Sequence, residues 1–327
     1  MIENYYNNND MYLQELFEAI KVSDIDRINN IIDMYFKQIC FDDCDKIGMT
    51  PLHYACVHDY NYDIICKLLS LVINNDLLCN RNIKDAYNRT PFMIATINKA
   101  EDIIEVMARD VLVDINCQDT ERNTPLHVAC MKKYKYVNII KTILEYYDTP
   151  RRASWISASK KNINGDTPLM LTLEYTDNDI CKNKTIWRMF FTTMNINKES
   201  DTKYLSSIFD QDFFKKLAKH KNINFLNFLC ENIGEYNMKY LLNIQDKLHM
   251  KPIHYVLDQT DFTNSDKIMC QILISLGSTI NSTILTVDAK GQTNPSKKNM
   301  ITKIKDKLKK SKNIISAEEW QEKMSIC

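Results

Sequence analysis

Apolar residues of this chain recur in short blocks with the spacing of three and four positions that is typical of one helix face. In the first block, leucine, phenylalanine and isoleucine occupy such positions from 13 to 20 and again from 25 to 32, with Ser23 and Asp24 between them. This pattern predicts two amphipathic helices joined by a tight turn. Residues 1–11 are polar and rich in asparagine, so we expect them to be disordered.

The clearest block is residues 124–145. Thr124 is a preferred N-cap residue, and Pro125 fits the first helical position. Ala129 and Cys130 are small, so a second helix over residues 139–144 can fold back closely against the first. A single unit of turn, helix, loop and helix cannot bury its apolar face alone. We therefore expect it to stack on further units of the same kind.

The same unit recurs along the chain. Its first helix opens with Thr-Pro-Leu-His, with a shorter Thr-Pro motif or with Lys-Pro-Ile-His; these openings begin at Thr50, Thr90, Thr124, Thr167 and Lys251. An aspartate stands five residues before most openings. The repeated unit closely resembles the ankyrin repeat, whose helix pair opens with T-P-L-H-x-A and has a period of about 33 residues. The resemblance covers roughly residues 12–310 and implies an all-α solenoid of stacked helix–turn–helix units, about seven of them, some degenerate.

The domain organisation follows from this register. We expect capping helices over residues 12–44, repeats opening near residues 50, 90, 124, 167, 203, 251 and 293, and a short C-terminal helix or tail over residues 311–327. The interval between Thr167 and Lys251 is long enough for two repeats. A hidden repeat is expected there, with residues 204–208 in its first helix and residues 225–229 in its second.

Composition narrows the class of partner. The 42 Lys and Arg residues balance the 42 Asp and Glu residues, so no global field favours nucleic acid or an acidic surface. Several of the 11 cysteines, including Cys56 and Cys130, occupy positions for small buried apolar residues, which implies a reducing compartment. Cys40 and Cys44 are one helical turn apart, but no second ligand pair follows at zinc spacing. We expect no metal and no cofactor.

No apolar run is long enough to span a membrane, and no signal peptide is visible. We therefore expect a soluble, cytoplasmic protein that meets its partner inside a cell, as a monomer. Residues 297–312 hold eight lysines and one aspartate. This segment is either the charged cap of the solenoid or a surface for anionic lipid or RNA.

The histidines are the first candidates for chemistry. His53, His127 and His254 stand at the same position of their repeats, which favours a role in helix capping over catalysis. The carboxylates around Asp42 and Asp45 fit a turn before a repeat. No phosphate-binding loop, nucleophile elbow or zinc-protease motif occurs. We expect no enzyme; an active site within the degenerate residues 175–250 is the remaining alternative.

The candidate partner-binding residues lie after the second helix of the repeat that opens at Thr124. The long turn of residues 146–155 contains two tyrosines, two arginines and a tryptophan, the composition of an interface hot spot. Basic and aromatic residues that end the first helix of the same repeat could belong to this surface. The full candidate set is Tyr146, Tyr147, Arg151, Arg152, Trp155, Lys132, Lys133 and Tyr134. The alternatives are that Trp155 covers a small core of its own turn and that the lysines are a solvated helix end.

The ankyrin resemblance implies a non-enzymatic scaffold that binds a partner protein through turn tips and inner helices. Two biological settings stay open. In one, an intracellular bacterium or large DNA virus places the protein in a host cell as an effector; the decayed repeats and Glu318, Glu319 and Glu322 near the C-terminus favour this setting. In the other, the protein is a housekeeping adaptor of an AT-rich eukaryote.

Overall fold

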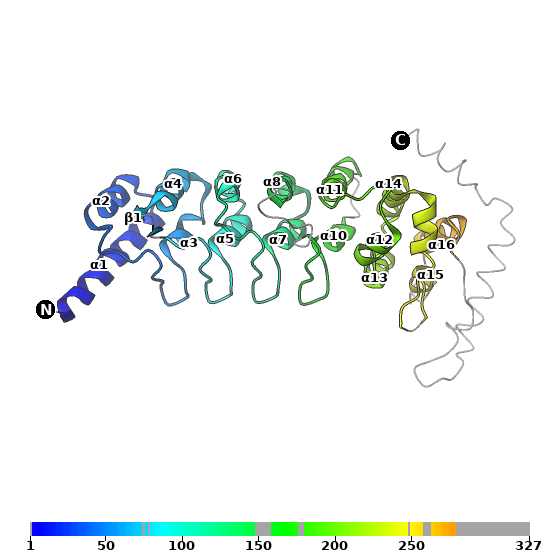
Figure 1. The fold of residues 1–327 in the computed structure, drawn as a ribbon, viewed down its shortest axis with the longest axis horizontal. Helices are drawn as coiled ribbons and strands as arrows, with labels where there is room; N and C mark the ends of the chain where they lie inside the picture. Colours follow the sequence, from blue (N-terminus) through cyan, green and yellow to red (C-terminus); the bar gives the residue numbers. More distant parts are fainter. Residues whose placement is uncertain are drawn as a thin grey trace. The chain divides into compact units, whose positions relative to one another are not determined.

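A computed structural model describes residues 2–73, 76–77, 79–147, 158–175, 180–247, 249–257 and 263–278. The chain divides into two compact units, residues 1–172 and 173–327. Figure 1 shows the helices of each unit. The described elements of the first unit are α1 (Ile2–Lys21), α2 (Ile25–Tyr35), α3 (Pro51–Ala55), η1 (Asp59–Asn61), α4 (Tyr62–Ser70), β1 (Val72–Ile73), β2 (Asp76–Leu77), α5 (Pro91–Asn98), α6 (Glu101–Arg109), α7 (Pro125–Met131), η2 (Lys133–Tyr136), α8 (Val137–Tyr147) and α10 (Pro168–Leu171).

Unit 1 is a stack of helix pairs. The inner helices pack in the order α1, α3, α5, α7 and α10, and the outer helices α4, α6 and α8 pack in a parallel row. Leu52, Phe92, Leu126 and Leu169, each directly after the helix-opening proline, are at most 1% exposed and form a continuous strip of core. The stacked helix pairs confirm the predicted all-α solenoid. The one pair of strands in the described chain, β1 and β2, is antiparallel and only two residues long on each side.

The helices of unit 1 begin where local capping chemistry places them. Thr50, Thr90, Thr124 and Thr167 are N-caps whose side-chain oxygens accept the N–H group three residues on, and a proline follows each of them. An N-cap of this kind contributes about 1 kcal/mol. The N-terminal segment differs from the sequence prediction. The helix α1 begins at Ile2 and so includes residues 2–11, for which the sequence predicts disorder.

Unit 2 begins within the 3-10 helix η3 (Thr172–Glu174). Its further helices are α11 (Ile180–Thr193), α12 (Thr202–Ile208), α13 (Gln211–His220), α14 (Ile223–Leu241), α15 (Pro252–Leu257) and α16 (Asn264–Ser275). Its core is aromatic: the Trp187 ring meets Phe225 edge-on at 4.9 Å, and Phe191 meets Phe228 at 4.9 Å.

The hidden repeat differs from the sequence prediction in one helix. Residues 225–229 lie in α14, as expected for a second helix, but the helix that packs on α15 is α13 rather than residues 204–208. Residues 204–208 belong to α12, which packs on α14. The stripe of Phe213, Phe214, Leu217 and Ala218 makes α13 the better inner helix, since all four are at most 3% exposed. The repeat expected near residue 293 and the tail after it lie outside the described residues.

Candidate protein-binding surface

Four turns of unit 1 share one geometry, and we call them fingers 1 to 4. They comprise residues 45–49, 85–89, 119–123 and 162–166, and Figure 1 shows the loops that carry them on one side of unit 1. In each finger the side chain of the first residue, an aspartate or asparagine, accepts the N–H groups two and four residues on. The fourth residue has a positive φ between 58° and 80°. Such turns are rigid because their own side chains close them.

Each finger is joined to the one before it by a backbone hydrogen bond. The bonds run from Ala86 N to Ile47 O (2.9 Å), from Thr120 N to Tyr87 O (3.0 Å) and from Ile163 N to Glu121 O (2.9 Å). Fingers 1 and 2 approach so closely that a Cβ on Gly48 would lie 2.9 Å from Ala86 N. Because Gly48 also has a φ of 79°, glycine is the residue that fits there.

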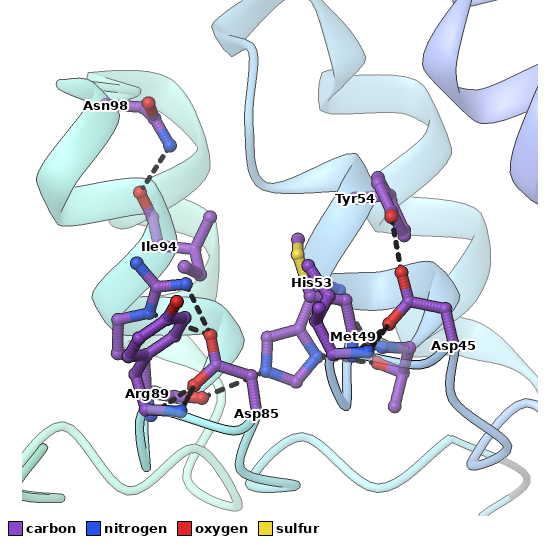
Figure 2. A network of polar contacts seen from close by, with 11 residues as sticks. Asp45, Met49, His53, Tyr54, Asp85, Arg89, Ile94 and Asn98 are labelled. Carbon is purple, nitrogen blue, oxygen red and sulfur yellow. Dashed lines mark hydrogen bonds and ion pairs between the residues drawn. The ribbon is translucent and has the colours of Figure 1, made fainter. Parts of the chain in front are cut away.

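Two histidines fasten fingers 2 and 4 to the inner helix of the preceding repeat. The Thr124 N–H donates to His127 Nδ1 at 3.1 Å, so the imidazole proton is assigned to Nε2, which donates to Asp166 O of finger 4 at 2.9 Å. His53 repeats this arrangement with Thr50 N (3.1 Å) and Arg89 O of finger 2 (3.0 Å). These bonds confirm the predicted capping role. Figure 2 shows the His53 ring directed toward finger 2.

Burial fixes the charge state of these rings. His127 and His254 are 0% exposed, and burial lowers the pKa of each from 6.5 to about 4. Burial also lowers the pKa of His53. The three imidazoles are therefore neutral at physiological pH. His53 and His127 hold structural bonds through both ring nitrogens, and His254 Nδ1 accepts the N–H of Lys251 at 2.9 Å. The three histidines are thus enclosed and hold backbone groups of the fold.

A tyrosine after two of the histidines closes a second polar contact. The Tyr54 hydroxyl donates to Asp45 Oδ2 at 2.6 Å, as Figure 2 shows, and Lys21 Nζ lies 5.1 Å from the centre of the Tyr54 ring. In unit 2 the Tyr255 hydroxyl donates to Asp246 in the same way. Burial and the neighbouring carboxylate raise the pKa of Tyr54 to about 12, so its hydroxyl stays protonated and anchors finger 1.

The finger tips expose apolar side chains. Ile47 of finger 1 is 46% exposed, Tyr87 of finger 2 is 56% exposed and Ile163 of finger 4 is 65% exposed. Because the turns that carry them are rigid, these side chains lose little conformational entropy when a partner covers them. Together with Arg89 they define what we call the finger surface: Ile47, Tyr87, Arg89 and Ile163.

Finger 2 presents the most elaborate tip. The Asp85 side chain is fully buried and binds Arg89 through Nε at 2.7 Å and Nη2 at 2.6 Å. The guanidinium of Arg89 lies 4.6 Å from the centre of the Tyr87 ring, a cation–π arrangement. The Asp85 carboxylate, seen with Arg89 in Figure 2, thus orients an arginine against an exposed aromatic ring. Tyrosine and arginine are the residue types enriched in interface hot spots.

The family model for ankyrin repeats, which spans three copies, matches residues 16–119 and, overlapping them, residues 60–154. Residues 16–154 of the chain are ankyrin repeats. Ankyrin repeats generally mediate protein–protein interaction, and the family is generally non-enzymatic. No curated protein matches the sequence. No helix among the described residues combines the length and apolar character needed to cross a membrane, and these residues contain no metal-ligand group of three or more His, Cys, Asp or Glu.

The candidate residues that the structure describes lie near the two ends of the outer helix α8. Tyr146 lies near the end of the outer helix α8, where its hydroxyl accepts a hydrogen bond from Arg109 Nε at 3.1 Å. Tyr147 is the last residue of α8. Lys132 is exposed at the end of α7, and Lys133 and Tyr134 belong to η2, which comes directly before α8. Because a helix rises about 1.5 Å per residue, the two groups are about 15 Å apart along α8.

The rest of the long turn, with Arg151, Arg152 and Trp155, lies outside the described residues. The expected surface that joins Tyr146 with Lys132 and Lys133 stays a prediction; the two lysines come shortly before α8 begins, and Tyr146 lies near its end. The finger surface was missed by sequence reasoning. Its signal was present, because an isoleucine or tyrosine at the tip of an Asx-closed turn has no local reason to be there.

Proposed function

We propose that this ankyrin-repeat protein is a non-enzymatic scaffold that recognises a partner protein with the finger surface of unit 1. The observation that carries the proposal is the exposure of Ile47, Tyr87 and Ile163 on turns that are already rigid before binding. A partner that buries these side chains loses little conformational entropy on the ankyrin side. The orientation of Arg89 by Asp85 supports finger 2 as the centre of the site.

The test is partner capture with the full chain as bait, followed by measurement of the affinity of the captured partner. Y87A should weaken binding by about 2 kcal/mol, which is roughly 30-fold in Kd. Tyr87 has no helix to support, so the melting temperature should be unchanged. Y236A is the matched control, because Tyr236 of α14 is 79% exposed and lies in unit 2. Equal Kd values for Y87A and the unmodified chain would place the site elsewhere.

The long turn of residues 146–155 is the second candidate for the same function. Arg151, Arg152 and Trp155 keep their hot-spot composition, and Tyr146 already pairs with the exposed Arg109 beside it. Replacing Arg152 and Trp155 together with alanine should weaken binding by about 2 kcal/mol or more if this turn carries recognition. Comparison of this double variant with Y87A on one partner assigns the site to the turn or to the finger surface.

We propose a reducing intracellular setting for this binding. The cysteines of the described residues are free thiols, and Cys56, Cys130 and Cys270 are packed into the core as apolar residues. The choice between a host-directed effector and an endogenous adaptor follows from the identity of the captured partner. A host protein supports the effector, and a protein of the same organism supports the adaptor.

A further inference from the structure

We propose that Asn164, at the tip of finger 4, is a site of spontaneous deamidation and that this finger therefore carries a slow covalent change. Asn164 and Gly165 form the one Asn-Gly pair of the sequence. Glycine after asparagine lets the following backbone nitrogen approach the side-chain amide, since no Cβ stands in its way. The proposal concerns the full chain in its folded state.

The environment of Asn164 leaves the reacting groups open. Its side chain is exposed, and no hydrogen bond within the described chain holds its amide. A Cβ built on Gly165 would meet nothing within 4 Å, so no other part of the described chain crowds the side of Gly165 where a side chain would stand. Asn162 and Asn123, by contrast, are held: Asn162 accepts two backbone N–H groups, and its amide donates to the Asn123 side chain at 3.1 Å.

The reaction requires water alone as co-reactant. The Gly165 nitrogen attacks Cγ of Asn164, the bond from Cγ to the side-chain nitrogen breaks, and ammonia leaves with the Gly165 amide proton. The resulting cyclic imide takes up one water molecule at either carbonyl. One direction of opening gives an aspartyl residue, and the other gives an isoaspartyl residue whose main chain is longer by one methylene group.

One contact opposes the reaction. The Gly165 N–H donates to Asn162 O at 3.0 Å and must leave this bond before the nitrogen can attack. Opening finger 4 alone breaks a few hydrogen bonds and leaves the helices packed, so it costs less than global unfolding. Deamidation is therefore expected to proceed through opening of finger 4 while the helices stay folded.

The product alters contacts that hold the repeat. An isoaspartyl residue at this position displaces Gly165 and Asp166 from Asn162, which now binds both of their N–H groups at 3.0 Å. It also moves Asp166 O away from His127 Nε2, at present 2.9 Å apart. A new charge appears beside the exposed Ile163 as well. That last consequence rests on the proposed function, whereas the covalent change and the loss of stability do not.

Peptide mapping by mass spectrometry tests the proposal on the full chain, incubated for weeks in mildly alkaline buffer well below its melting temperature. We expect Asn164 to show the mass increase of an amide replaced by a carboxyl group sooner than any other asparagine. Part of the product should be isoaspartyl, and the melting temperature should fall as the converted fraction rises. Asn88 is the internal comparison, because it is also exposed in a finger but precedes Arg89.

Two variants make the outcome decisive. N164Q should show no conversion at this position. G165N should slow conversion of Asn164 while keeping the turn, since Asn88 already adopts a φ of 58° at the equivalent position of finger 2. Conversion of Asn164 no faster than Asn88, or only at temperatures that unfold the chain, would overturn the proposal, because the Gly165 hydrogen bond would then be protective.

Discussion

Replacing His127 by glutamine should remove a defined part of the dependence of stability on pH. Glutamine at this position of the helix still reaches back to the N-cap N–H in a capping box, so the start of α7 is preserved. The bond from His127 Nε2 to Asp166 O is lost, which should lower the free energy of unfolding by about 1 kcal/mol at neutral pH. The informative quantity is the change in this free energy between pH 7 and pH 5.

Burial depresses the pKa of His127 in the folded chain to about 4, from 6.5 when unfolded. Between these values the unfolded state binds the proton and the folded state does not, so acid favours unfolding. The stability that the neutral imidazole contributes is complete above about pH 6.5 and is lost as pH falls toward 4. For these two pKa values, lowering the pH from 7 to 5 costs about 1.8 kcal/mol per histidine.

Urea unfolding followed by circular dichroism at both pH values measures this cost. The free energy of unfolding of H127Q should fall by about 1.8 kcal/mol less than that of the unmodified chain over the same interval. Some carboxylates also make stability depend on pH, but below the interval from pH 7 to pH 5. Asp266 is an example, because its bonds with Lys221 and Thr263 lower its pKa below 3.8 against the effect of burial. An equal fall in both proteins would refute the neutral, buried imidazole. The same substitution at His254 repeats the test in unit 2.

Three further predictions concern packing, a buried ion pair and the thiols. A129L should overpack the contact between α7 and α8, where Ala129 is 0% exposed, and lower stability by about 1–3 kcal/mol in urea unfolding; an unchanged midpoint would contradict this packing. R81M should lower the free energy of unfolding by about 3 kcal/mol, since Arg81 is 4% exposed and binds Asp110, Cys79 O and Leu69 O. A loss below about 1 kcal/mol in the same assay would show that water replaces these bonds. Reducing agent should leave the melting temperature unchanged. A thiol reagent should label the exposed Cys44 before Cys56, because Cys56 is buried and burial raises the pKa of its thiol; the reverse order would refute the assigned burial.

Local chemistry made the repeats of unit 1 readable from the sequence. The start of an inner helix is decided within four residues, as α7 shows. The Thr124 side chain and the His127 ring each accept a backbone N–H, and Pro125 has no N–H to satisfy. The periodic isoleucines of the outer helices, such as Ile139 and Ile140, likewise report burial directly. The same signals are missing from the interval before α15, and there the prediction chose the wrong inner helix.

The helix α13 shows what pattern alone cannot decide. Both α12 and α13 carry apolar stripes, and the choice of the helix that packs on α15 depends on contacts between segments that are far apart in sequence. The finger surface was missed for a related reason. Ile47 and Ile163 look like core residues by composition, and the backbone bonds that join their turns to the neighbouring fingers connect segments far apart in sequence.

The histidine bonds give the solenoid a direction along the chain. His53 and His127 each hold a carbonyl that comes 36 and 39 residues later, in the finger of the next repeat. During synthesis the imidazole therefore leaves the ribosome before the finger that it fastens, and the repeats that open at Thr50 and Thr124 each offer a ready anchor to the one that follows. Growth from the N-terminal end therefore meets a prepared partner at finger 2 and again at finger 4. A fragment that starts at finger 2 would instead lack the ring that holds its first turn, so shortening the protein from its beginning should harm folding more than shortening it from its end.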